Sequence, residues 1–226
     1  MSDTTLDKAY RMLTSEDDGR VCKDIPENAC NHQPRNFLTH VASLGATKTA
    51  DGLIDPKLVL SWLLTQLGTP AVFIGLLVPV REAGALLPQL FTAAGLRSLP
   101  LRKWAWSAGS VVQGLSALAI ALAAITLEGV AAGYAIVGAL TVLALARSVC
   151  SVTYKDVLGK TVSKSRRGTA TGLASSASAL MVIIFGLALA SGVFTRMPVV
   201  ITGLCLAGAL WMLAAFMFAT LEEQPG

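Results

Sequence analysis

The chain has 226 residues, of which 54% are hydrophobic and 14% charged, and its mean hydropathy is +0.62. Soluble domains carry about 25% charged residues, so the part of the chain after Pro56 has too few charges to cover a water-exposed surface. The net charge of +4 does not indicate nucleic-acid binding, because the basic residues form short clusters between apolar runs, as membrane topology requires.

Residues 1–35 form a first segment with a dense mixture of acidic and basic side chains. This segment has no apolar core, so it is not a secretory signal peptide. Cys22 and Cys30 lie in it at a spacing that matches no common zinc pattern, and we expect free thiols there, as at Cys150 and Cys205. The segment is predicted to be a polar cytoplasmic N-terminal extension.

Residues 58–96 are mostly apolar but are interrupted at 68–70 (Gly-Thr-Pro) and again at 79–82 (Pro-Val-Arg-Glu). A turn at the second interruption would leave a following helix of about 14 residues, which is too short to span a bilayer. A turn at the first interruption, which has a typical turn sequence, gives a full helix over 71–96. The preceding helix, 37–67, is then unusually polar and is predicted to face a water-filled cavity; its polar members include His40, Lys48, Asp51, Asp55 and Lys57.

Four later segments are long and apolar enough to cross a bilayer, which takes about 20 residues. The predicted fold class is therefore an all-α membrane protein, with a six-transmembrane-helix bundle over residues 36–221. Its helices are predicted at 37–67, 71–96, 104–127, 130–157, 168–194 and 198–221. Residues 222–226 are predicted to start a cytoplasmic linker or tail.

Lysine and arginine residues in short loops set the orientation of a membrane protein. The loops after the second and fourth predicted helices hold Arg97, Arg102, Lys103, Lys160, Lys164, Arg166 and Arg167. The opposite side offers only Arg196, beside the acidic Glu128. Both basic loops, and with six spans both termini, are predicted to be cytoplasmic, in a multi-pass protein of the cell (inner) membrane.

Arg81 and Glu82 lie about ten residues into the second predicted helix, near mid-membrane. A charge there costs about 2.5–3.5 kcal/mol, so both side chains must face the bundle interior, a partner or water. Two interpretations stay open: a substrate- or proton-handling pair on a pathway, or an ion pair that locks neighbouring helices. Arg147 is another deep charge, and Glu82 is its predicted counter-ion. The predicted pathway residues are Asp51, Arg81, Glu82, Gln89, Gln113 and Arg147.

Three stretches, in chain order, carry a family resemblance. The loop at 94–103 ends in a basic pair, Arg102-Lys103; Arg147 lies inside the fourth helix; and Arg166-Arg167-Gly168 opens the fifth. In this respect residues 36–221 resemble the N-terminal half of a major facilitator superfamily transporter, although Ser98 and Leu101 stand where that family has an acidic residue and a glycine. Residues 154–160 resemble a subgroup of poorly characterised bacterial permeases.

The resemblance implies twelve helices in two halves around a central cavity, of which this chain is one half. It implies a secondary active transporter that moves a small solute, with or without a coupled proton, by alternating access. Its partners would be the lipid bilayer, the solute, and a missing C-terminal half or a second copy of the chain. Cytoplasmic gating is expected from Arg102, Lys103, Asp156, Arg166 and Arg167.

Two other functions stay open: a six-helix membrane enzyme or assembly factor, and a homo-oligomeric channel. We expect no enzyme activity, no catalytic residues, no cofactor and no metal, because the sequence has no glycine-rich phosphate loop and no metal-spaced cluster of histidine and cysteine. A channel would need a filter loop, and no re-entrant apolar loop is visible in the sequence. Transport is therefore the function that the sequence favours.

Overall fold

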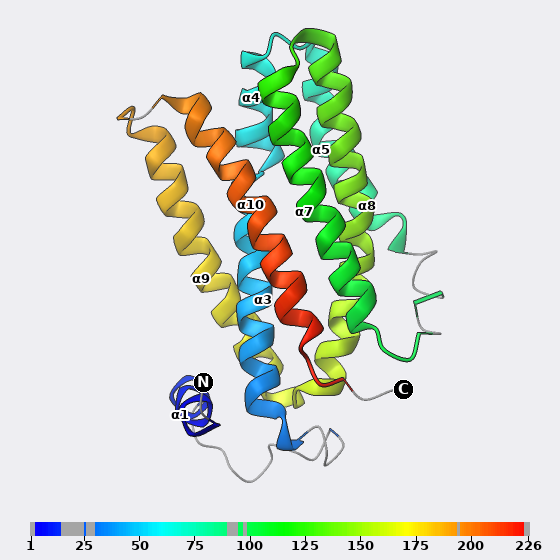
Figure 1. Cartoon of the computed structure of the whole chain (residues 1–226), viewed down its shortest axis with the longest axis vertical. Coiled ribbons are helices and arrows are strands. Elements are labelled where there is room, and N and C mark those ends of the chain that lie inside the picture. Colours follow the sequence, from blue (N-terminus) through cyan, green and yellow to red (C-terminus); the bar gives the residue numbers. More distant parts are fainter. Residues whose placement is uncertain are drawn as a thin grey trace.

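The computed structural model describes residues 3–14, 25, 30–89, 95–96, 99–193 and 195–223, and the elements in these residues are all helical (Figure 1). The all-helical class predicted from the sequence is confirmed for this part of the chain. In chain order the elements are α1 (Asp3–Leu13), α3 (Gln33–Leu53), the π-helix η1 (Pro56–Leu60), α4 (Ser61–Gln66), α5 (Ala71–Leu86), α7 (Lys103–Thr126), α8 (Gly129–Thr161), α9 (Lys164–Ala190) and α10 (Arg196–Ala219).

Four of these helices, α7, α8, α9 and α10, are long and apolar enough to cross a membrane. They correspond to the last four predicted spans, and their length and composition indicate a membrane protein. The predicted boundaries at 157 and 168 were wrong, because α8 continues to Thr161 and α9 begins at Lys164. The expected basic loop is thus reduced to Val162 and Ser163, and its charged residues lie on the ends of two helices.

The first predicted span, 37–67, is not one helix. α3 ends at Leu53, and the chain restarts as η1 and α4. The Asp55 carboxylate accepts hydrogen bonds of 2.9 Å from the backbone N–H groups of Lys57 and Leu58, and Pro56 follows Asp55 directly. An acidic cap with proline at the next position is a helix-start signal, so this dipeptide ends one helix and begins another inside the bundle.

The second predicted span, 71–96, was also too long. α5 stops at Leu86, two residues before Pro88, and proline disfavours helical geometry in the residue before it. The predicted continuation to residue 96 lies partly outside the described residues. With 16 residues, α5 is shorter than the roughly 20 that a span needs, so the six full spans expected from the sequence are not confirmed.

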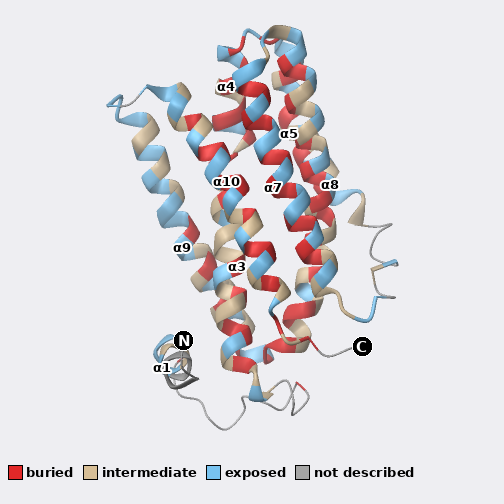
Figure 2. Ribbon diagram, viewed as in Figure 1, coloured by how far each residue is buried: buried red, intermediate tan, exposed pale blue. Residues whose placement is uncertain are grey.

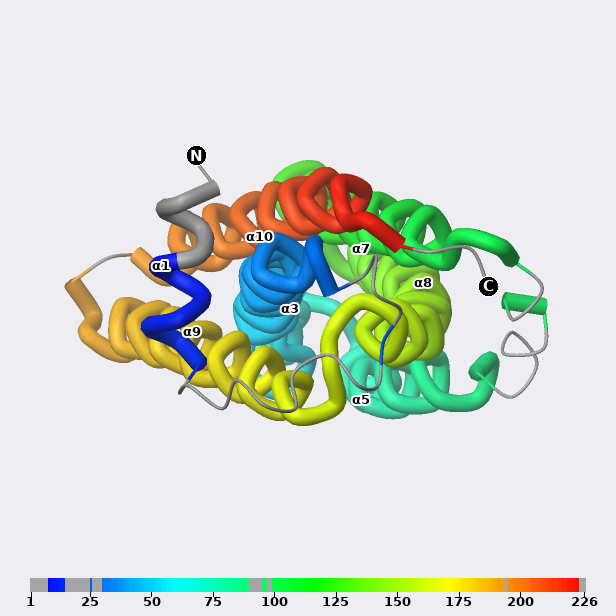
Figure 3. The backbone as a smooth tube through the Cα atoms, turned by 90° about the horizontal axis from the view of Figure 1, so that it is seen from below, coloured from blue at the N-terminus to red at the C-terminus, as the bar shows by residue number. Residues whose placement is uncertain are grey.

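The helices pack in a pattern that repeats. α3 packs on α9 and α10, α8 packs on α5 and α7, and α7 also packs on α10. Exchanging α3 with α8, α5 with α9 and α7 with α10 leaves this set of contacts unchanged. The two three-helix units are therefore α3, α5 and α7 in the first and α8, α9 and α10 in the second. In Figure 1, α3 ascends and α8 descends, so the two units run in inverted directions. Figure 3 shows α7 and α10 side by side along one edge of the bundle.

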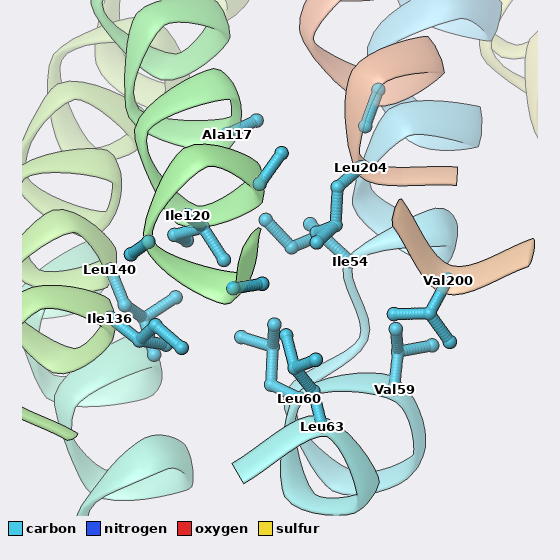
Figure 4. Packing of buried hydrophobic residues seen from close by; sticks show 14 of the residues in the cluster. Ile54, Val59, Leu60, Leu63, Ala117, Ile120, Ile136, Leu140, Val200 and Leu204 are labelled. Atoms are coloured by element: carbon cyan, nitrogen blue, oxygen red, sulfur yellow. The ribbon is translucent and has the colours of Figure 1, made fainter. Parts of the chain in front are cut away.

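The largest group of buried apolar side chains lies where η1 and α4 meet α7, α8 and α10 (Figure 4). Leu60, Leu63 and Ile136 are fully buried there. By contrast α9 is mostly exposed (Figure 2) and presents apolar side chains such as Leu180 and Leu187 at its surface. Hydrocarbon is as apolar as these side chains, so a bilayer suits this exterior.

The cysteines depart from expectation at one position. Cys30 is disulfide-bonded, so the free thiol expected there was wrong; sequence spacing alone does not report whether two thiols can meet. Cys150 and Cys205 are free, the first buried and the second exposed. Cys22 lies outside the described residues.

Candidate functional site

The centre of the candidate site is a carboxylate shared by two guanidinium groups. Arg81 of α5 donates a hydrogen bond of 2.6 Å to one oxygen of Asp51 in α3, and Arg147 of α8 donates to the other oxygen. The side chains of Asp51, Arg81 and Arg147 are 19%, 8% and 38% exposed. This ion triad links three helices that belong to both repeated units.

The predicted pairing of Glu82 with Arg147 was wrong, because Asp51 is the partner of Arg147. Adjacent residues on a helix point roughly 100° apart, and α5 turns Arg81 inward while Glu82 is exposed. Arg81, Glu82 and Arg147 were predicted from the sequence as deep charges, and of these Glu82 is exposed; the sequence does not tell which face of α5 meets α3 and α8.

A close contact between helices sets the position of the two arginines. A Cβ atom added at Gly84 would lie 2.9 Å from the Cβ atom of Ala144, so α5 and α8 approach each other closely at this point. Arg81 and Arg147 are each three residues away from this contact along their helices. Residues three apart lie on neighbouring parts of one helix face, so both guanidinium groups reach the carboxylate on α3.

Two cavities adjoin the triad. The first, called here the tryptophan cavity, has a volume of about 200 Å³ and is lined by Leu44, Thr47, Lys48, Asp51, Trp106, Gln113, Arg147, Cys150, Ser151, Tyr154, Lys155 and Trp211. The second, the helix-break cavity, measures about 290 Å³ and is lined by Asp51, Gly52, Asp55, Pro56, Lys57, Arg81, Glu82, Ala85 and Arg147. Asp51 and Arg147 line both cavities, so their ion pair stands between the two spaces.

The three other predicted pathway residues lie in different surroundings. Gln113 is buried beside the tryptophan cavity, where its amide donates to the Cys150 sulfur at 3.2 Å. Glu82 lines the helix-break cavity. Gln89 donates to the carbonyl oxygen of Ala85, one turn earlier, at 2.6 Å and is not among the lining residues of either cavity. The role of Gln89 in a pathway stays a prediction; the residue lies beyond the end of α5 at Leu86.

Several lining residues escaped the sequence analysis, above all Trp106, Trp211 and Tyr154. A signal for part of this set was present. Ser151, Tyr154 and Lys155 follow Arg147 at intervals of four, seven and eight residues, which is the spacing of one helix face. The two tryptophans carry no such signal, since an isolated tryptophan in an apolar helix is as consistent with a contact to lipid as with the wall of a cavity.

The predicted gating residues lie at the opposite end of the bundle from the α7–α8 turn. Arg102, at the start of α7, forms an ion pair with Asp156 of α8. Arg167 donates instead to the carbonyl oxygens of Val162 and Gly159, at 2.9 and 2.7 Å, and so caps the C-terminal end of α8. Arg166 is buried. The structure thus brings Arg102 and Asp156 together, while Arg167 stabilises the turn between α8 and α9.

Glu222 and Glu223, the first two residues of the predicted linker or tail, bind the helix ends, and residues 224–226 lie outside the described residues. Glu223 accepts a hydrogen bond of 2.8 Å from the backbone N–H of Lys103 and pairs with Lys160 at 3.4 Å. Glu222 pairs with Arg35 and contacts His32, both at 3.2 Å. Lys103 also donates its ammonium group to the carbonyl oxygen of Leu221 at 2.6 Å. This acidic pair connects the ends of α3, α7 and α8.

Comparison with protein-family models, with curated proteins and with solved structures found no match to this chain. The resemblance to the major facilitator superfamily therefore rests on the sequence motifs, and membership of that family stays a proposal.

Proposed function

We propose that this chain is one half of a secondary active transporter, which moves a small solute across a membrane by alternating access. The observation that carries the proposal is the position of the Asp51–Arg147 ion pair, which lines both cavities. The pair separates the two spaces, so rocking of the helices around it would open one space to water while the other closes. Alternating access is largely such rocking of helix bundles around a fixed central site.

Two features of the fold support the same function. The contacts among the helices follow an inverted repeat of two three-helix units, an arrangement recurrent in secondary transporters. In addition, α3 is interrupted at Asp55 and Pro56, four residues beyond the central carboxylate. Irregular backbone at membrane depth is tolerated where it lines a cavity, and both residues line the helix-break cavity.

The transporter is proposed to need a second half, supplied by a covalent continuation or by a second copy. Arg147 is 38% exposed, and Lys48, Lys57 and Glu82 are exposed as well. A charge facing lipid costs about 2.5–3.5 kcal/mol. Several such charges would therefore strongly destabilise a single copy of the bundle, since the total stability of a folded protein is about 5–15 kcal/mol. A partner that encloses a wet cavity would remove this cost.

Alternating access predicts that the two cavities open in turn. Single cysteines at Ser151→Cys and Ala85→Cys, in a background in which Cys22, Cys30, Cys150 and Cys205 are replaced by alanine, would report the tryptophan and helix-break cavities. We expect the rates of modification by a small maleimide to change reciprocally, one rising as the other falls, when pH or an added solute changes. The measurement is the labelling rate of the full chain in vesicles.

The variant Arg147→Gln tests whether the ion pair separates the two cavities, because it removes one partner of that pair. It should raise both labelling rates together in the monodisperse fraction of the protein. If both cysteines of the unperturbed chain react at equal, condition-independent rates, the two spaces form one continuous channel and the transporter proposal is wrong.

The proposed orientation places the basic helix ends in the cytoplasm of a cell (inner) membrane, but one observation favours the opposite orientation. The end of α8 and the start of α9, which carry basic residues, lie at the same end of the bundle as the start of α3 (Figure 1), and this favours the cytoplasm for that end. Cys30, close before α3, is disulfide-bonded, and disulfides are typical of oxidising compartments. We give the basic residues more weight, since they act during membrane insertion.

An impermeant thiol reagent on intact cells decides the orientation. In the same cysteine-substituted background, Glu128→Cys, in the α7–α8 turn, should be modified from outside. Lys164→Cys, at the start of α9, should be modified only after the membrane is permeabilised. The reverse pattern would invert the topology, and modification of both from outside would contradict the helix count.

A further inference from the structure

The two cavities differ in charge. The tryptophan cavity is lined by the cations Lys48, Arg147 and Lys155 and by a single carboxylate, Asp51. That carboxylate is already shared between Arg147 and Arg81. Positive charge is therefore in excess on the wall of this cavity.

The helix-break cavity is balanced by comparison. Its charged lining residues are the three cations Lys57, Arg81 and Arg147 and the three carboxylates Asp51, Asp55 and Glu82. The excess of positive charge is thus a property of one cavity and not of the whole interior. Clefts lined by one sign of charge between low-dielectric walls concentrate ions of the opposite sign.

The other walls of the tryptophan cavity are aromatic and polar. Trp106 and Trp211 both line it and are almost completely buried from solvent. The Tyr154 hydroxyl is buried and has no hydrogen-bond partner among the described residues. Tyr154 therefore contributes its ring to the wall of the cavity, since the buried hydroxyl is not accessible to a ligand there.

We propose that the tryptophan cavity binds a small organic anion with an aromatic or other flat apolar body. The identification rests on the proposed transport function and names its substrate class. Lys48 from α3 and Lys155 from α8 attract the anionic group, and the tryptophans contact its apolar body. Both lysines are exposed, so their removal leaves the buried packing intact.

Three ring-matched probes test the charge preference: benzoate, benzamide and benzamidine, which are anionic, neutral and cationic. The full chain in phosphatidylcholine nanodiscs at constant ionic strength would be titrated by tryptophan fluorescence, with thermal unfolding as a second measurement. We expect benzoate to bind about tenfold or more tightly than either of the other two, because a hydrogen bond between charged groups is about twice as strong as a neutral one.

Lysine variants locate the site. Lys48→Gln and Lys155→Gln should each weaken benzoate binding by about five- to tenfold, the effect of losing one nearby charge in a partly screened site. Lys57→Gln is the matched control, because Lys57 is also an exposed lysine but lines the other cavity. It should leave the benzoate affinity unchanged.

The outcomes separate the ligand class from the transport function. Absence of saturable benzoate binding, or benzamidine binding equally well, overturns the anion site while leaving reciprocal labelling of the cavities as an independent test of transport. Benzoate binding without reciprocal labelling keeps the anion site and rejects the transporter. A lipid phosphate offers the same chemistry, so loss of benzoate binding in nanodiscs containing phosphatidylglycerol would reassign the site to a lipid headgroup and overturn the solute proposal.

Discussion

Replacing Asp51 by asparagine is expected to destabilise the folded protein by about 3–5 kcal/mol, the range measured when one partner of a buried ion pair is removed. The effect is large because this carboxylate has two partners, and its removal strands the charges of both Arg81 and Arg147. The midpoint of thermal unfolding in detergent and the monodisperse yield should both fall. Asp55→Asn is the matched control, since the asparagine oxygen can still cap the N–H groups of Lys57 and Leu58.

Arg81 and Arg147 should not contribute equally to the stability of the folded protein. Arg81 is 8% exposed and Arg147 is 38% exposed, so water screens the second more strongly, and Arg81→Gln should cost more stability than Arg147→Gln. The double variant of Asp51→Asn with Arg147→Gln should be more stable than the sum of the single losses predicts. Additive losses would mean that the pair is not coupled in solution, and a control variant as unstable as Asp51→Asn would contradict the special role of the triad.

The sequence predicted the parts of the fold that depend on composition alone. Long apolar segments specify α7, α8, α9 and α10 without reference to their neighbours, because a bilayer requires length and hydrophobicity. The break after α3 was missed for a different reason. Asp55 and Pro56 form a recognisable helix-start signal, but the segments on both sides of it are together long enough for an uninterrupted span, and length alone does not exclude a break.

The charged residues at the centre of the candidate site were predictable one by one, whereas the contacts between them were not. A buried charge is costly wherever it lies, which is why Asp51, Arg81 and Arg147 could be singled out from the sequence. Which of them touch depends on how α5 is rotated, and that rotation is set by the contact of Gly84 with Ala144. Such packing follows from the shapes of two helix surfaces together, so one sequence segment does not reveal it.

The contact between α7 and α10 is expected to be sensitive to added volume. A Cβ atom at Gly114 would lie 3.0 Å from the carbonyl oxygen of Gly208, and one at Gly208 would lie 3.2 Å from the carbonyl oxygen of Gly114. Each glycine therefore faces the backbone of the other helix, which cannot move aside as a side chain can. In the inverted repeat this is the contact of two equivalent helices with each other.

Gly114→Leu and Gly208→Leu should each destabilise the protein by about 1–3 kcal/mol or more, as overpacking of a close contact does. Gly138→Leu on α8 is the matched control, because no heavy atom lies within 4 Å of a Cβ atom placed there, and its effect should stay within about 0.5 kcal/mol. The unfolding midpoint in detergent would measure all three variants. Gly114→Ala should fall between the control and Gly114→Leu, since it adds only the first atom of the clash. If the control loses as much stability as the other two leucine variants, the loss comes from replacing any helical glycine, and the close crossing of α7 and α10 does not determine the packing of the bundle.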